Sequence, residues 1–163
     1  MVKAIQLLLE SGKLTDYDFV FTGNLEDYRN PEYINRLKGI MESETVKNNI
    51  KLLGFVGREE QLSIMKNARF IVQPSLCEGW GTVLEDAKVL DKSVLLSDIP
   101  VHREQKNEKC ILFDPHRPEE LADLIVRLAG RREGEWQEDV TVGIANMYRE
   151  ASEYSKALQR VFR

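Results

Sequence analysis

The chain has 163 residues and a formal net charge of −4, with 42% hydrophobic and 31% charged residues, which is the composition of a globular domain with its own core. Its lysines and arginines are scattered, so the charge pattern gives no support to nucleic-acid binding. Two distant cysteines, Cys77 and Cys110, match neither a metal site nor a disulfide framework. No signal peptide or membrane span is predicted. We therefore expect a cytoplasmic protein, either free or peripheral to the inner face of the membrane.

Predicted helices and strands alternate along the chain. Helices are expected over 2–11, 31–46, 58–68, 82–92 and 118–130, and strands over 17–24, 49–57, 69–75, 93–98 and 109–114. Pro31 stands at a favourable first-turn position of its helix. A C-terminal helical segment is expected over 135–163. The alternation predicts an α/β fold with a Rossmann-like, doubly wound parallel sheet, built as a single domain over 1–163.

The segment between the strand over 69–75 and the helix over 82–92 carries the candidate site. Ligands of open α/β sheets bind beyond the carboxyl ends of the strands. Gly79 and Gly81 would let an anion approach the backbone closely, and the helix N-terminus that follows attracts phosphate. Glu78 and Glu85 lie on either side of this turn and can accept hydrogen bonds from hydroxyl groups. The pattern predicts a ligand with phosphate in the middle and hydroxyls on either side, such as a nucleotide sugar.

Each of these features has a plain structural alternative when it is taken alone. A Gly-x-Gly turn before a helix is common and by itself favours a simple tight turn. Glu85 alone is typical of a solvated helix face, Glu78 of a loop carboxylate, and Trp80 of a core or rim position. His116 is expected in a surface turn, and His102 lies in the loop on the side of the site with no visible partner.

The stretch VQPSLCEGWGTVLEDAKVLDKSVLLSDIPVHRE resembles the signature segment of retaining GT-B glycosyltransferases of the glycogen-synthase-like family, glycosyl transferases group 1. The matching residues are Pro74-Ser75, Glu78-Gly79-Trp80-Gly81, Leu84-Glu85, Ser93-Val94, Ser97-Asp98, Pro100 and Glu104. The segments FTGN, LLGFVGREEQLSIMKNA and ILFDPHRPEELADLI are similar to further parts of the family pattern. One residue fewer than usual separates the two glutamates, and Asp91-Lys92-Ser93 stands where the family has a glycine, which should affect only the helix exit.

The resemblance implies a donor-binding domain, the C-terminal half of a GT-B fold, whose enzyme transfers a hexose from a nucleotide diphosphate sugar with retention. Glu78 would be the catalytic-site residue that holds the sugar hydroxyls, and Glu85 would hold the ribose. The predicted donor-binding residues are Gly57, Arg58, Gly79, Trp80, Gly81, Thr82, Val83 and Glu85. The donor is a substrate, and no cofactor is expected. No metal-binding residues are predicted.

The chain starts at the helix that follows the first strand of the family pattern, so the first strand of the sheet is expected to be missing. The strands over 17–24 and 69–75 would then flank a gap with unpaired backbone groups, which favours self-association. The acceptor-binding domain would be supplied in cis or in trans, and the isolated chain should transfer no sugar. Two alternatives stay open, a non-catalytic nucleotide-binding subunit and an inactive truncated fragment.

Overall fold

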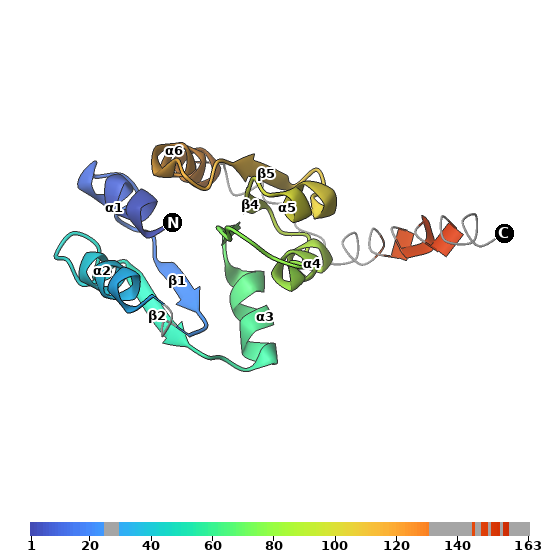
Figure 1. The fold of residues 1–163 in the computed structure, drawn as a ribbon, viewed down its shortest axis with the longest axis horizontal. Helices are drawn as coiled ribbons and strands as arrows, with labels where there is room; N and C mark the ends of the chain where they lie inside the picture. The colour runs from blue at the N-terminus through green and yellow to red at the C-terminus, as the bar shows by residue number, and fades with distance from the viewer. Residues whose placement is uncertain (25–29, 131–144, 146–147, 150, 154, 157–163) are drawn as a thin grey trace. The chain divides into compact units, whose positions relative to one another are not determined.

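The computed structural model describes residues 1–24 and 30–130, with short pieces at 145, 148–149, 151–153 and 155–156. Most of the expected helical segment over 135–163 therefore lies outside the described residues. In chain order the elements are α1 (Val2–Glu10), β1 (Phe19–Thr22), α2 (Pro31–Met41), β2 (Ile50–Gly54), α3 (Arg58–Asn67), β3 (Ile71–Gln73), α4 (Thr82–Val89), β4 (Val94–Ser97), α5 (Pro100–Gln105), β5 (Cys110–Phe113) and α6 (Pro118–Ala129) (Figure 1).

Every helix and strand predicted before residue 131 is present, and α5 is an addition. The prediction was wrong about the end of α2, which stops at Met41 rather than at 46. Ser43 and Thr45, which follow the helix, favour turns because their hydroxyls compete for backbone hydrogen bonds. The start of α2 agrees with the expectation, since Pro31 is its first residue and the Asn30 side chain accepts a hydrogen bond from the Tyr33 amide.

The strands form two parallel sheets. β1 pairs with β2, with Phe19 opposite Ile50, and the second sheet has the order β3-β4-β5, with Ile71 opposite Val94. Among the described strands no ladder joins β1 to β3, which is the place where the sequence predicted an interruption. The α/β class with parallel strands is confirmed. The chain divides accordingly into two compact units.

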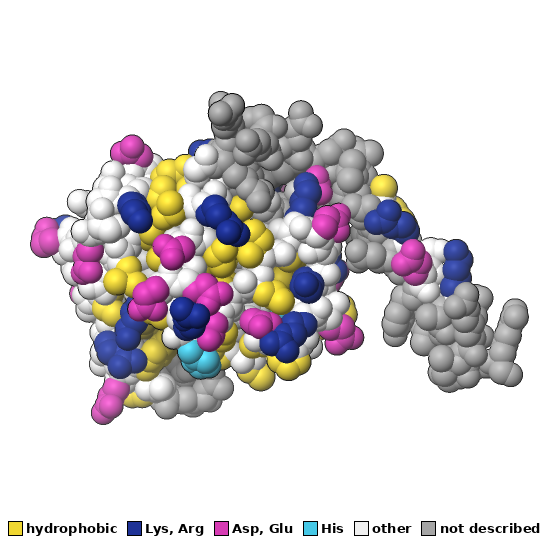
Figure 2. Space-filling model, turned by 90° about the horizontal axis from the view of Figure 1, so that it is seen from above, with side chains coloured by type: hydrophobic (Ala, Val, Ile, Leu, Met, Phe, Trp, Pro, Cys, Tyr) yellow, Lys and Arg dark blue, Asp and Glu magenta, His cyan; other side chains and the backbone are white. Residues whose placement is uncertain are grey.

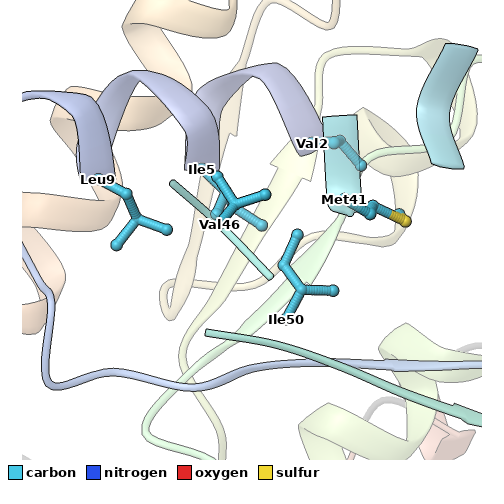
Figure 3. Close-up of a cluster of buried hydrophobic side chains, with 6 residues drawn as sticks. All are labelled: Val2, Ile5, Leu9, Met41, Val46 and Ile50. Carbon is cyan, nitrogen blue, oxygen red and sulfur yellow. The ribbon is translucent and has the colours of Figure 1, made fainter. Parts of the chain in front are cut away.

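The first unit contains α1, β1, α2 and β2, together with α6. Val2, Ile5 and Leu9 lie on one face of α1 because their spacing follows the helical repeat. They pack against three buried side chains that come from the end of α2, the following turn and β2, namely Met41, Val46 and Ile50 (Figure 3). α6 lies beside α1 (Figure 1), and the Tyr17 hydroxyl donates to the Ala129 carbonyl at 3.1 Å. Phe19 and Phe21 of β1 also pack against this cluster, so the core holds the β1–β2 sheet against α1.

The second unit is built around β4, all of whose residues are buried. A short strand without an exposed face is typical of the middle of a parallel sheet covered on both sides. Val94 and Leu96 pack against Leu84 and Ala87 of α4 and against Met65. This packing holds α4 against the β3–β4 ladder, so its N-terminus lies just after the end of β3.

α4 ends in a Schellman motif. The Lys92 amide donates to the Ala87 carbonyl at 2.8 Å, the Asp91 amide donates to Lys88 at 3.0 Å, and Asp91 has a φ of +55°. This left-handed position is the one that helices most often fill with glycine. The carboxylate of Asp91 lies 2.6 Å from Lys109 Nζ, an ion pair that glycine could not make. The replacement of the family's glycine by Asp91-Lys92-Ser93 thus lies at the C-terminal end of α4, as expected.

On the face shown in Figure 2, basic and acidic side chains are interspersed. No helix within the described part of the chain is long and apolar enough to cross a membrane.

Candidate functional site

The candidate site is the turn between β3 and α4, and it lies entirely within the second unit. Gly81 is the N-cap residue of α4, and no side chain caps this helix. Trp80 is 57% exposed and Thr82 is exposed as well. The N-terminal end of α4 therefore lies at an accessible surface, where the positive end of the helix dipole favours an anion.

Glu78 has one carboxylate oxygen fully engaged and one oriented toward a histidine. Its Oε1 accepts hydrogen bonds from Gln73 Nε2 at 2.5 Å and from the Ser75 hydroxyl. Its Oε2 lies 3.6 Å from His102 Nε2. Because a carboxylate oxygen offers about two lone pairs, Oε1 is saturated by the protein, whereas Oε2 can still accept from a ligand. The side chain is 15% exposed.

Burial raises the pKa of Glu78, but hydrogen bonds from Ser75 and Gln73 together with the nearby His102 lower it by more. The net effect holds the pKa below its usual value of 4.5. Glu78 is therefore ionised at neutral pH and acts as a hydrogen-bond acceptor only.

Acid is expected to remove the stability that ionised Glu78 contributes. Since the folded-state pKa lies below the usual 4.5, the contribution is complete above that value and is lost as the pH falls through the folded pKa. Glu78→Gln does not titrate, so the difference in unfolding free energy between wild type and this variant should shrink between about pH 5 and about pH 2. Urea unfolding at several pH values measures it, and a constant difference would contradict the prediction.

The sequence showed no partner for His102 and placed it in a loop, whereas the structure places it in α5 and gives it partners. Its ring is fully buried, and Nδ1 lies 2.8 Å from the Ser97 carbonyl oxygen and 3.1 Å from the Ser97 hydroxyl. A carbonyl only accepts, so Nδ1 carries a hydrogen, and Nε2 carries one as well only in the protonated ring. Nε2 has no hydrogen-bond partner among the described residues and lies opposite Glu78 Oε2. The other histidine agrees with expectation, because His116 is exposed in a turn after β5.

Glu85 is held by a glutamine that the sequence did not single out. Its Oε1 accepts from Gln105 Nε2 at 2.9 Å and lies 3.4 Å from Lys88 Nζ. The amide oxygen of the same Gln105, 3% exposed, accepts the Gly81 N–H at 2.9 Å. Glu104, the residue that matched the family pattern, is exposed instead. The reading of Glu85 as a plain solvated position is thus incomplete, because its carboxylate is tied to the glycine turn.

The two glycines of the turn differ in what requires them. A Cβ at Gly81 would lie 2.9 Å from Glu78 Oε2 and 3.2 Å from Gln105 Oε1, whereas a Cβ at Gly79 would meet nothing within 4 Å. Gly81 is therefore required by the packing of the turn itself. The predicted role of Gly79 beside an anion stays a prediction.

Of the other predicted donor-binding residues, Val83 is half-buried in the first turn of α4. Gly57 and Arg58 lie at the start of α3, where the Gly57 carbonyl accepts from the Gln61 amide at 2.8 Å. Both belong to the first unit, so their role at the nucleotide base stays a prediction. Within the described residues, no group of three or more His, Cys, Asp or Glu side chains is arranged to hold a metal ion.

Comparison with known proteins gives a consistent result. The family model described as Glycosyl transferases group 1 matches residues 1–135. An uncharacterised glycosyltransferase of Methanocaldococcus jannaschii is 25% identical over 136 residues, which make up 80% of this chain and 36% of that protein. The chain therefore spans about a third of this relative's length.

Solved structures with the same fold include the crystal structure of Anabaena Alr3699/HepE in complex with UDP and glucose, with a TM-score of 0.66 at 17% identity, over 91% of this chain and 44% of that one. A glycosyltransferase from Rickettsia africae gives a TM-score of 0.63 at 19% identity, over 97% of this chain and 44% of that one. These similarities show the fold, a Rossmann-like α/β domain as it occurs in GT-B proteins.

Proposed function

Because the chain belongs to the glycosyl transferases group 1 family, we propose that it is the nucleotide-sugar-binding part of a retaining hexosyltransferase. The observation that carries the proposal is the pair of carboxylates around the N-terminus of α4. The protein contacts of Glu85 both end on Oε1, and those of Glu78 leave acceptor capacity on Oε2. Each glutamate thus retains an oxygen that can accept from a ligand hydroxyl on its own side of an anion-binding helix end.

In this proposal the diphosphate lies at the backbone from Trp80 to Val83. The positive end of the α4 dipole would stabilise the charge that develops on the departing diphosphate. Glu85 would accept from the ribose hydroxyls, and Glu78 from the sugar hydroxyls. The Anabaena protein of the same fold was solved with UDP and glucose, which supports a ligand of this class.

The acceptor would be held by another domain, in cis or in trans. Orientation of two substrates supplies roughly 7–11 kcal/mol of a barrier, and the chain spans 44% or less of the solved structures that it resembles. We therefore propose that the residues described here bind the donor and transfer no sugar by themselves. A role as a nucleotide-binding subunit for a separate acceptor protein follows from the same partial coverage.

The test is a calorimetric titration of the chain with UDP, ADP, GDP and inorganic pyrophosphate. We expect binding of at least one nucleoside diphosphate, and Glu85→Ala should weaken it by roughly 1.5–3 kcal/mol because a charge-assisted hydrogen bond to the ribose is lost. Pyrophosphate binding should change little, since the N-terminus of α4 is intact.

Glu108→Ala is the matched control, because it removes the same charge from an exposed position. Failure of all nucleoside diphosphates to bind at millimolar concentration would refute the proposed function. Equal weakening of nucleotide and pyrophosphate by Glu85→Ala would show that Glu85 supports the turn rather than the ribose.

A further inference from the structure

α5 is a short helix with two buried polar side chains on one face. His102 and Gln105 are three residues apart, a spacing that places them side by side on a helix. Both are almost completely buried, although each carries polar atoms that are costly to remove from water. A short helix that only covers a sheet would bury apolar residues at these positions, so their polarity needs a reason.

Two side chains anchor α5 to the end of β4. His102 Nδ1 donates to the carbonyl of Ser97, the last residue of β4, at 2.8 Å. Arg103 forms a bidentate ion pair with Asp98, to which it donates through Nε at 2.5 Å and through Nη2 at 2.8 Å. Ser97 in turn donates its hydroxyl to the Ser75 carbonyl at 2.5 Å. α5 is thus fixed to the strand beside β3 and to the loop that carries Glu78.

From this anchored helix, one side chain reaches each glutamate. His102 Nε2 lies 3.6 Å from Glu78 Oε2, a pair that is attractive when the ring carries hydrogens on both nitrogens. Gln105 Nε2 donates to Glu85 Oε1 at 2.9 Å. Gln105 also accepts the N–H of Gly81 at 2.9 Å, so it links the glycine turn to the second carboxylate. Two carboxylates from different elements are therefore placed relative to each other by a third element.

A ligand cannot take over these contacts. His102 is fully buried and its Nε2 is inaccessible to solvent, and Gln105 is 3% exposed. Their polar atoms reach a ligand only through the glutamates and the Gly81 amide. We infer that α5 is the positioning element of the donor site, with His102 setting the Glu78 carboxylate and Gln105 setting Glu85 together with the glycine turn. This inference rests on the proposed function, since it assigns the two glutamates to two parts of one donor.

The inference predicts that the two halves of α5 act on different parts of the ligand. Calorimetry of the whole chain with UDP and with UDP-glucose gives two quantities. The first is the Kd for UDP, and the second is the Kd for UDP divided by the Kd for UDP-glucose, which measures the contribution of the glucose. His102→Asn keeps a donor for Ser97 but is too short to reach Glu78. It should reduce the ratio by about fivefold and leave the Kd for UDP within about twofold. Gln105→Met should do the reverse, weakening UDP by about fivefold at an unchanged ratio.

His102→Gln is the rescue variant, because its amide nitrogen reaches about as far as Nε2 and can donate to Glu78. It should retain the wild-type ratio. Thermal unfolding of each variant checks that the fold is kept. If both variants change both quantities to the same extent, or if neither changes either quantity, α5 only supports the fold and the inference is overturned.

A second measurement needs no nucleotide. In wild type the carbon-13 carboxyl signal of Glu78 should titrate below its usual pKa of 4.5, and in His102→Asn it should titrate closer to that value. The amide hydrogen of Gly81 should exchange faster in Gln105→Met. If the wild type binds neither nucleotide, the proposed function fails, and these two measurements still decide the positioning roles. An unchanged Glu78 titration or unchanged Gly81 protection overturns the corresponding half.

Discussion

Replacing Leu96 by alanine is expected to lower the free energy of unfolding by about 2–5 kcal/mol. Leu96 is 0% exposed on β4 and packs with Met65, Leu84, Ala87 and Val94 in the core of the second unit. β4 has no exposed face, so the cavity left by three missing carbon atoms has little room to collapse. Since domains of this size are stable by only about 5–15 kcal/mol, the loss is a large fraction of the total.

The urea midpoint at constant slope measures this change. Leu76→Ala is the matched control, because Leu76 is 65% exposed in the loop after β3 and its truncation should stay within about 0.5 kcal/mol. A Leu96→Ala variant as stable as the Leu76→Ala control would show that β4 is not the centre of this core.

Replacing Gly81 by alanine is expected to cost about 1–3 kcal/mol of stability through overpacking and to abolish measurable nucleotide binding. The new methyl group would lie 2.9 Å from Glu78 Oε2 and 3.2 Å from Gln105 Oε1. Glu78 cannot simply swing away, because Gln73 and Ser75 hold its other oxygen. The substitution therefore disturbs both the contact of Glu78 with His102 and the contact of the turn with Gln105.

Gly79→Ala provides the comparison for stability. Its Cβ would meet nothing within 4 Å, so its unfolding free energy should stay within about 0.5 kcal/mol of wild type or rise slightly because the unfolded chain is less flexible. Urea unfolding of the two variants, followed by titration of Gly81→Ala with UDP, makes the test. Equal loss of stability at both glycines would mean that the contacts around Gly81 are not what the turn depends on.

The arrangement also bears on the unusual spacing of the two glutamates. One residue fewer than usual lies between them, which could have turned one carboxylate away from the other. Glu78 lies in the loop before α4, and Glu85 lies within the helix. Both nevertheless contact α5, at His102 and Gln105. The shorter spacing therefore leaves the two carboxylates on the side of the turn that α5 covers.

Local sequence determined most of the elements. Apolar positions at helical spacing, such as Val2, Ile5 and Leu9, need only the geometry of one helix to specify a buried face. Pro31 marks the start of α2 because it fits the first turn of a helix. The family pattern around Glu78 and Glu85 likewise lies in one continuous stretch, so the candidate site could be located before any contact was known.

Local sequence could not determine which groups hold that site. α5 is only six residues long, too short for a periodic pattern, so His102 was placed in a loop and Gln105 was not singled out. Gln105 contacts Gly81, which lies 24 positions earlier, and no local pattern predicts a pairing at that distance. Such contacts exist only because β3 and β4 run parallel and bring their carboxyl ends together. The sequence by itself determined the carboxylates and the turn, whereas the tertiary structure decided their partners, because a buried polar group is satisfied by whatever the fold places beside it.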